Sequence, residues 1–261
     1  MDAAAAVRVA ITSAGLEGWN PTPDEVTALT ALAEGSCSFE HFAESAGAAQ
    51  GNRAGNRRPF GSMRRAGYTV PGTTVLRNRF GIVDPEAAHR IEFALAAGRT
   101  CELHLGLDGM VPRSARGLLE VHRHLFRDMY PWAGSVRTVQ LSKNGTKFAS
   151  VGRIAEYFDE INALVDGARW PELDHGSLAY VCSALYAVMN QAHPFRDGNG
   201  RAGRAFLCEL TRETAFHIDY SHTDRAEWVA ASIDSAPMRS NGTPSPRPFL
   251  PIFRAVVQPS D

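Results

Sequence analysis

The stretch HPFRDGNGRAGR occupies residues 193–204 and holds one histidine, one carboxylate, three glycines and three arginines. It separates two helical patterns, because the apolar stripe before it runs out near Ala192, Pro194 interrupts that stripe, and a new pattern resumes at Ala202. The glycines therefore stand at the amino-terminal opening of a helix, where unpaired N–H groups and the helix dipole favour an anion. The stretch predicts a phosphate-binding loop in a helical protein.

The second half of this loop supplies the groups that bind phosphate. Glycine lets the backbone of Gly198, Asn199 and Gly200 approach phosphate oxygens closely. Arg201 and Arg204 are three residues apart on the same helix, so both can donate charge-assisted hydrogen bonds to one polyphosphate. We therefore expect these five residues to act as a unit.

Other side chains of the loop are suited to a metal and to proton transfer. Asp197 provides an oxygen ligand of the kind Mg²⁺ uses together with phosphates and water. His193 has an ordinary pKa near 6.5, which suits a general base at neutral pH. Phe195 is predicted to anchor the loop in the core. Each residue alone has an ordinary structural explanation, such as a cap or a turn, but their combination favours a site for a polyphosphate with its metal.

The rest of the chain has mainly helical periodicity. Apolar residues recur at spacings of three and four within 118–129, 154–164 and 178–189, and we predict that these are core faces without chemistry. Between the first two, residues 136–148 read VRTVQLSKNGTKF, whose Asn-Gly pair is typical of a two-residue hairpin. The sequence thus predicts an all-α bundle that carries one β-hairpin.

The chain is predicted to contain a small helical domain (1–46), a linker (47–67) and a main domain (68–261). In the small domain we expect a helix over 3–17 and a second helix that begins at Thr22. The linker has five arginines and no acidic residue. Because it has almost no aromatic residues, we interpret it as a solvated tether and not as a nucleic-acid site.

Composition limits the possible partners and the compartment. Lys and Arg total 27 against 28 Asp and Glu, so no global field attracts nucleic acid or an anionic membrane. The four cysteines are far apart and are expected to be reduced. No stretch is long and apolar enough to span a bilayer, and the first residues lack a basic leader. We expect a cytoplasmic protein with no nucleic-acid or membrane partner.

The loop at 193–204 resembles the complete HxFx(D/E)GNGRxxR signature of the Fic family, and the similarity extends from about residue 118 to about residue 235. The resemblance implies a Fic-type helical bundle that transfers AMP from ATP to a Ser, Thr or Tyr hydroxyl of a target protein. It implies that His193 is the general base and that Asp197 holds Mg²⁺. The phosphate-binding residues that it implies are Gly198, Asn199, Gly200, Arg201 and Arg204.

The hairpin at 136–148 is similar to the flap of this family, which aligns the backbone of the target beside the site by strand addition. The flap positions implied by the resemblance are Val139, Leu141 and Lys143. In that role the backbone edge matters more than the side chains.

A second resemblance concerns SAGLEG at residues 13–18, which is similar to the (S/T)xxxE(G/N) inhibitory motif of Fic regulation and to small helical antitoxins. Ser13 and Glu17 are four residues apart and are expected on one face of a helix. The resemblance implies that Glu17 pairs with Arg204 in the place of the ATP γ-phosphate. A tether of about 20 residues reaches roughly 25 Å, so the segment can dock on its own core or on that of a neighbouring chain.

Several alternatives remain open at this point. Gly61-Ser62-Met63 is compatible with an engineered join, with the vestige of a toxin start codon or with a natural fusion. The resemblance to Fic toxins points to DNA gyrase and topoisomerase IV subunits as targets. One alternative function is transfer of another nucleotide or of phosphocholine. Another is a catalytically silent toxin–antitoxin module that only binds a partner.

Overall fold

The computed structural model describes residues 2–47, 67–106, 109–143, 145–237 and 242–260. Almost all of the predicted linker, including Gly61-Ser62-Met63, lies outside the described residues. The predicted domain boundaries at 46 and 68 stay a prediction. The chain forms two compact units: the first comprises Met1–Ala14, Trp19–Gly109 and His122–Ser135, and the second comprises Gly15–Gly18, Met110–Val121 and Val136–Asp261.

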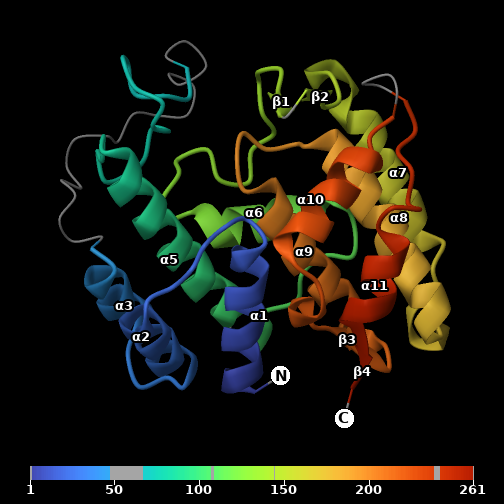
Figure 1. Cartoon of the computed structure of the whole chain (residues 1–261), viewed down its shortest axis with the longest axis horizontal. Helices are drawn as coiled ribbons and strands as arrows, with labels where there is room; N and C mark the ends of the chain where they lie inside the picture. The colour runs from blue at the N-terminus through green and yellow to red at the C-terminus, as the bar shows by residue number, and fades with distance from the viewer. Residues whose placement is uncertain (1, 48–66, 107–108, 144, 238–241, 261) are drawn as a thin grey trace. The chain divides into compact units, whose positions relative to one another are not determined.

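The first unit is built from helices whose starts follow local sequence signals. Its helices are α1 (Ala3–Gly15), α2 (Pro23–Ala33), α3 (Phe39–Ser45) and α5 (Pro85–Leu105), and α2 and α3 both pack on α5 (Figure 1). Thr22 caps α2 in a capping box, since its hydroxyl accepts from Glu25 N and Glu25 Oε2 accepts from Thr22 N at 2.7 Å. Ser38 caps α3, where its hydroxyl accepts from His41 N at 3.3 Å. The predicted start of the second helix at Thr22 is confirmed.

The end of α1 differs slightly from the prediction. The helix was expected to continue to Glu17, but its last assigned residue is Gly15. Trp19 N donates to Ala14 O and Gly18 N donates to Gly15 O at 2.8 Å, which is the hydrogen-bond pattern of a Schellman motif. Gly18 has φ +99°, a conformation that other residues rarely adopt. Glu17 therefore lies in the closing turn of α1 and not within the helix.

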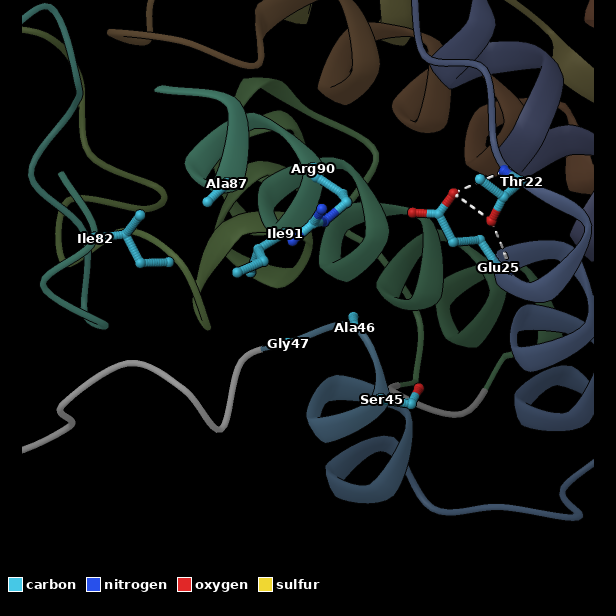
Figure 2. Close-up of a pocket in the computed structure, with 9 residues that line it drawn as sticks. All are labelled: Thr22, Glu25, Ser45, Ala46, Gly47, Ile82, Ala87, Arg90 and Ile91. Carbon is cyan, nitrogen blue, oxygen red and sulfur yellow. Dashed lines mark hydrogen bonds between the residues drawn. The ribbon is translucent and has the colours of Figure 1, made fainter. Parts of the chain in front are cut away.

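The first unit also has a surface hollow of about 480 Å³ beside the capping box of α2 (Figure 2). None of the predicted site residues lines it. The residues that line it are Thr22, Glu25, Ser45, Ala46, Gly47, Ile82, Ala87, Arg90 and Ile91.

The second unit contains most of the remaining elements, and α6 (Ala115–Phe126) is divided between the two units at Val121. Its helices are α7 (Ile154–Asp166), α8 (His175–Ala192), α9 (Asn199–Leu210), α10 (Arg225–Asp234) and α11 (Leu250–Val256). Its short 3-10 turns are η2 (Val151–Arg153), η3 (Trp170–Glu172), η4 (Thr211–Glu213) and η5 (Tyr220–His222). Its strands are β1 (Ser142–Lys143), β2 (Thr146–Lys147), β3 (Phe216–Ile218) and β4 (Val257–Pro259).

Helix α8 is at the centre of this unit, where α7, α9 and α11 pack against it (Figure 1). The predicted apolar stripe of α8 is confirmed, because all four of its residues are buried: Leu178, Cys182, Leu185 and Met189. The predicted core face of α7 (154–164) differs at its end. Leu164 is half-buried, and Val165 is the last buried apolar residue of this helix. Burial of these side chains removes apolar area from water and supplies the main force that holds α8 and the loop after it (193–198) in place.

Two small antiparallel sheets are present in the described residues. The predicted hairpin is confirmed by β1 and β2, which pair in the register Ser142↔Lys147 and Lys143↔Thr146. The second sheet pairs β3 with β4 in the register Phe216↔Pro259 and was not predicted. Its strands are three residues long and far apart in sequence, so no local turn signal announces their pairing.

The four cysteines are all unpaired, and Cys101, Cys182 and Cys208 are buried. Across the described residues, every helix is either too short or too polar to traverse a membrane.

Candidate active site

The predicted loop joins two helices of the second unit. Helix α8 ends at Ala192, and His193 follows as its C-cap with φ 42° and ψ 56°. Such left-handed values are uncommon outside glycine, and they turn the chain sharply away from the helix. Helix α9 then begins at Asn199 behind Gly198, whose φ of +75° is a left-handed value that favours glycine. The expected position of Gly198, Asn199 and Gly200 at a helix opening is thus observed.

The loop is held from within by Phe195 and Asn199. Phe195 is fully buried, as expected. Asn199 Oδ1 accepts from Phe195 N at 2.8 Å, and Asn199 Nδ2 donates to Phe195 O at 2.9 Å. Because these two bonds occupy its amide, Asn199 can contribute its backbone N–H to an anion while its side chain fixes the shape of the loop.

His193 is half-buried, and its ring stacks on Phe148 with 3.6 Å between ring centroids and 9° between planes. Burial, aided by the positive charges of Arg137 and Lys143, lowers the pKa of His193 from 6.5 to about 3. The imidazole is therefore neutral at pH 7. Its Nδ1 lies 3.4 Å from Asn190 O, a contact that favours hydrogen on Nδ1 and leaves Nε2 as the proton acceptor. We expected the ordinary pKa from the sequence, because sequence does not report burial.

Arg201 and Arg204 lie on the first turns of α9 and are both buried. The guanidinium carbon of Arg204 lies 5.3 Å from the ring centroid of Trp228, and Tyr220 donates its hydroxyl to Arg204 O at 3.1 Å. A fixed, desolvated guanidinium attracts a carboxylate or phosphate far more strongly than a surface arginine does.

The carboxylate of Glu17 lies at the opening of α9. Arg204 Nη2 donates to Glu17 Oε1 at 3.1 Å, and the Glu17 side chain is 29% exposed. A methyl group added to Gly200 would collide with the same oxygen, so the carboxylate lies directly against the first turn of the helix. Burial opposes ionisation of Glu17, but Arg204, Arg201 and Lys143 outweigh it and lower its pKa below 4.5. The expected contact between Glu17 and Arg204 is thus present, and it places an anion at the predicted phosphate site.

A cavity of about 700 Å³ opens beside this ion pair, within the second unit. This is within the range of pockets that bind small molecules. Loop residues 197–200 and Glu17 contribute polar groups to its wall, and most of its apolar residues come from α8 and α10. The residues that line it include Glu17, Lys143, Phe148, Tyr186, Met189, His193, Asp197, Gly198, Asn199, Gly200, Arg201, Trp228, Val229 and Ile233.

Asp197 is exposed and lines this cavity. No cluster of three or more His, Cys, Asp or Glu side chains that could bind a metal by themselves occurs in the described ranges. The donor set thus fits Mg²⁺ that is held by one carboxylate together with phosphates and water, and it does not fit an all-protein metal cage.

The predicted flap residues lie before and within the first strand of the hairpin. Val139 and Leu141 precede β1, and Lys143 belongs to β1 and lines the cavity. Val139 is 38% exposed, and Leu141 O accepts from Phe148 N at 3.3 Å. Ser13 is buried in α1 and belongs to the first unit, so its inhibitory role stays a prediction.

Sequence reasoning missed two residues that contact the histidine. Phe148 stacks on the His193 ring, and Arg137 donates from Nε to His193 O at 2.7 Å. In the sequence, Phe148 is only the last residue of the predicted hairpin segment. The one signal for Arg137 was a lone cation within an otherwise uncharged run of the hairpin segment, and such a pattern is usually a solvated charge.

A helix opening with two buried arginines, a neutral histidine and a carboxylate is an arrangement suited to binding a polyphosphate beside a proton acceptor. Comparisons with known proteins agree with this class. Residues 112–211 match the model of the Fic/DOC family. A probable protein adenylyltransferase from Sinorhizobium fredii is 34% identical over 173 residues, which cover 63% of this chain and 85% of that protein. The chain belongs to the Fic/DOC family.

Other relatives differ in length. The protein adenylyltransferase VbhT from Bartonella schoenbuchensis is 35% identical over 170 residues, which cover 64% of this chain and 35% of VbhT. The chain thus matches about a third of that relative. Among solved structures, BepC from Bartonella tribocorum with bound AMPPNP has a TM-score of 0.64 and 22% identity, covering 74% of this chain and 97% of that one. The likeness to BepC shows that the two proteins share the fold.

Proposed function

We propose that this protein is a protein adenylyltransferase that transfers AMP from ATP to a hydroxyl side chain of a target protein, and that Glu17 inhibits it. The observation that carries the proposal is the carboxylate of Glu17, which lies against Gly200 and pairs with Arg204 beside His193. An anion held at the opening of a helix and by a buried arginine supports the proposal of a phosphate site there. Relatives named protein adenylyltransferases support this activity.

The cavity, together with Arg204 behind Glu17, has suitable groups for each part of ATP. The apolar wall, with Trp228, Val229 and Ile233, would receive the base. The opening of α9 and Arg201 would bind the α- and β-phosphates, and Arg204 would bind the γ-phosphate. Mg²⁺ on Asp197 would neutralise phosphate charge. His193 would then take the proton of a target hydroxyl while the oxygen attacks the α-phosphorus and pyrophosphate leaves.

Inhibition follows from the two anions that Arg204 can bind. While Glu17 holds this guanidinium, the γ-phosphate cannot take the same position, so ATP lies in a pose that does not align its α-phosphate with the target hydroxyl. The Fic toxin resemblance makes the ATPase subunits of DNA gyrase and topoisomerase IV the first targets to examine, and it makes the segment before Glu17 an antitoxin-like domain that acts in cis or on a neighbouring chain.

The donor is tested by offering labelled donors side by side to the Glu17→Gly variant in a bacterial lysate. We expect label from α-labelled ATP on protein bands, and we expect this label to disappear when EDTA removes Mg²⁺. The test also includes CTP, GTP and CDP-choline. Stronger labelling from one of these would replace ATP as donor, and no labelling from any donor would favour a catalytically silent binding module.

A further inference from the structure

The buried side chain of Arg137 connects the flap to the catalytic loop. Arg137 is 1% exposed and comes shortly before β1. Its Nε donates to His193 O at 2.7 Å, and its Nη2 donates to Ala192 O at 3.3 Å. Its backbone N donates to Pro194 O at 2.7 Å. Three consecutive carbonyls at the end of α8 therefore accept hydrogen bonds from one residue.

The same guanidinium also bonds to both ends of the hairpin. Arg137 Nη1 donates to Val139 O at 2.7 Å, before β1, and Nη2 donates to Ala149 O at 2.5 Å, after β2. Two bonds beside Arg137 reinforce this connection, since Ala149 N donates to Gln191 O at 2.9 Å and Gln191 Nε2 donates to Lys147 O at 3.4 Å. The base of the flap is thereby attached to the last turn of α8.

Two physical reasons make this arrangement specific for arginine. The carbonyl end of a helix carries partial negative charge, which a buried cation stabilises. The planar guanidinium has five N–H donors in fixed directions, so it can bridge carbonyls from three segments at once, whereas an ammonium group is a compact point charge. Arg137 also bonds to the carbonyl of a residue with left-handed dihedrals, and such strain persists only where the surroundings enforce it.

We propose that Arg137 is a positioning residue, which fixes the stem of the flap to the end of α8 and so sets the distance between a docked target hydroxyl and His193. This inference rests on the proposed function. A target strand would be positioned by the flap, and the general base His193 is positioned by the loop after α8. Arg137 donates hydrogen bonds to both the flap and this loop. Proton transfer requires hydrogen-bond distance, and a misplacement of about 1 Å lowers a rate by roughly 100-fold.

The test compares Arg137→Lys with its parent in the Glu17→Gly background, with purified target and labelled ATP. We expect kcat for AMP transfer to fall roughly 100-fold and the KM for the target to rise. The dissociation constant for ATP should stay within about twofold, because Arg137 is not among the residues that line the cavity. Equal kcat and KM in the two proteins would overturn the inference, as would a loss of ATP binding as large as the loss of kcat.

The matched control is Arg99→Lys, which alters a half-buried arginine that also donates side-chain hydrogen bonds. Arg99 lies in the first unit, where Nε donates to Asp128 Oδ2 at 2.7 Å, and its side chain is 12% exposed. We expect this variant to keep the parent kcat. If it lost as much activity as Arg137→Lys, general destabilisation would explain both and the inference would fail.

A second measurement needs neither activity nor a variant. In ¹⁵N-arginine NMR spectra of the wild-type protein, hydrogen bonds from Nε and both Nη groups should slow rotation of the Arg137 guanidinium and give separate Nη resonances. A single averaged Nη signal would refute the inference even if Arg137→Lys does not fold. If the parent transfers no AMP while Arg137 is locked, the proposed function fails and the structural connection stands.

Discussion

Replacing Glu17 with glycine is expected to raise the rate of AMP transfer roughly 10- to 150-fold, because a hydrogen bond to a charged group contributes about 1.5–3 kcal/mol. Arg204 donates to Glu17 at 3.1 Å, and Glu17 lines the cavity. Removal of the carboxylate makes the Arg204 guanidinium available to bind the γ-phosphate of ATP. The measurement is the initial rate of label transfer from α-labelled ATP to target protein at saturating Mg²⁺.

One further variant separates the charge of Glu17 from its size, and a second serves as a control at another carboxylate. Glu17→Gln keeps the size of the side chain but removes its charge, so we expect activation between wild type and Glu17→Gly. Glu40→Gln changes an exposed carboxylate in the first turn of α3 and should leave the rate unchanged. The inhibition hypothesis is wrong if Glu17→Gly is no faster than wild type.

Replacing His193 with alanine in the Glu17→Gly background is expected to lower transfer by roughly 10²- to 10⁴-fold, the usual contribution of a general base. The neutral ring has Nε2 available to accept a proton, and alanine offers no acceptor. ATP affinity should change little, because the opening of α9 and its arginines would hold the phosphates. Single-turnover transfer and ATP binding measured on the same sample separate these two effects.

The control for this change is His222→Ala, which removes an exposed histidine of η5. It should transfer AMP at the rate of the Glu17→Gly parent. Transfer that survived the loss of His193 would show that another group takes the proton, and it would remove His193 from the mechanism.

The helical fold and the catalytic loop were predictable because their signals are local. Pro194 and Gly198 mark the helix end and the next helix start, and spacings of three and four mark the core faces of α7 and α8. Hairpin β1–β2 was predictable from its Asn-Gly turn. The pairing of β3 with β4 was not predictable, because it joins distant segments whose sequence carries no local signal.

Within the site, residue types were predictable but their environments were not. The role of Arg137 depends on carbonyls from three segments, and the stack of Phe148 on His193 depends on how the flap returns to α8. The lowered pKa of His193 likewise follows from burial. Glu17 could be connected with Arg204 only through a family resemblance, because 187 positions separate them in sequence.

The central claim is that Glu17 and the γ-phosphate of ATP compete for Arg204, and the most direct test is calorimetric binding of ATP and of ADP to wild type and to Glu17→Gly. ADP lacks the γ-phosphate, so it does not need the position that Glu17 occupies on Arg204. We predict that Glu17→Gly binds ATP at least about tenfold more tightly than wild type, in keeping with one charge-assisted hydrogen bond, while ADP affinity changes less than about twofold. An equal gain for both nucleotides, or no gain for ATP, would contradict the claim.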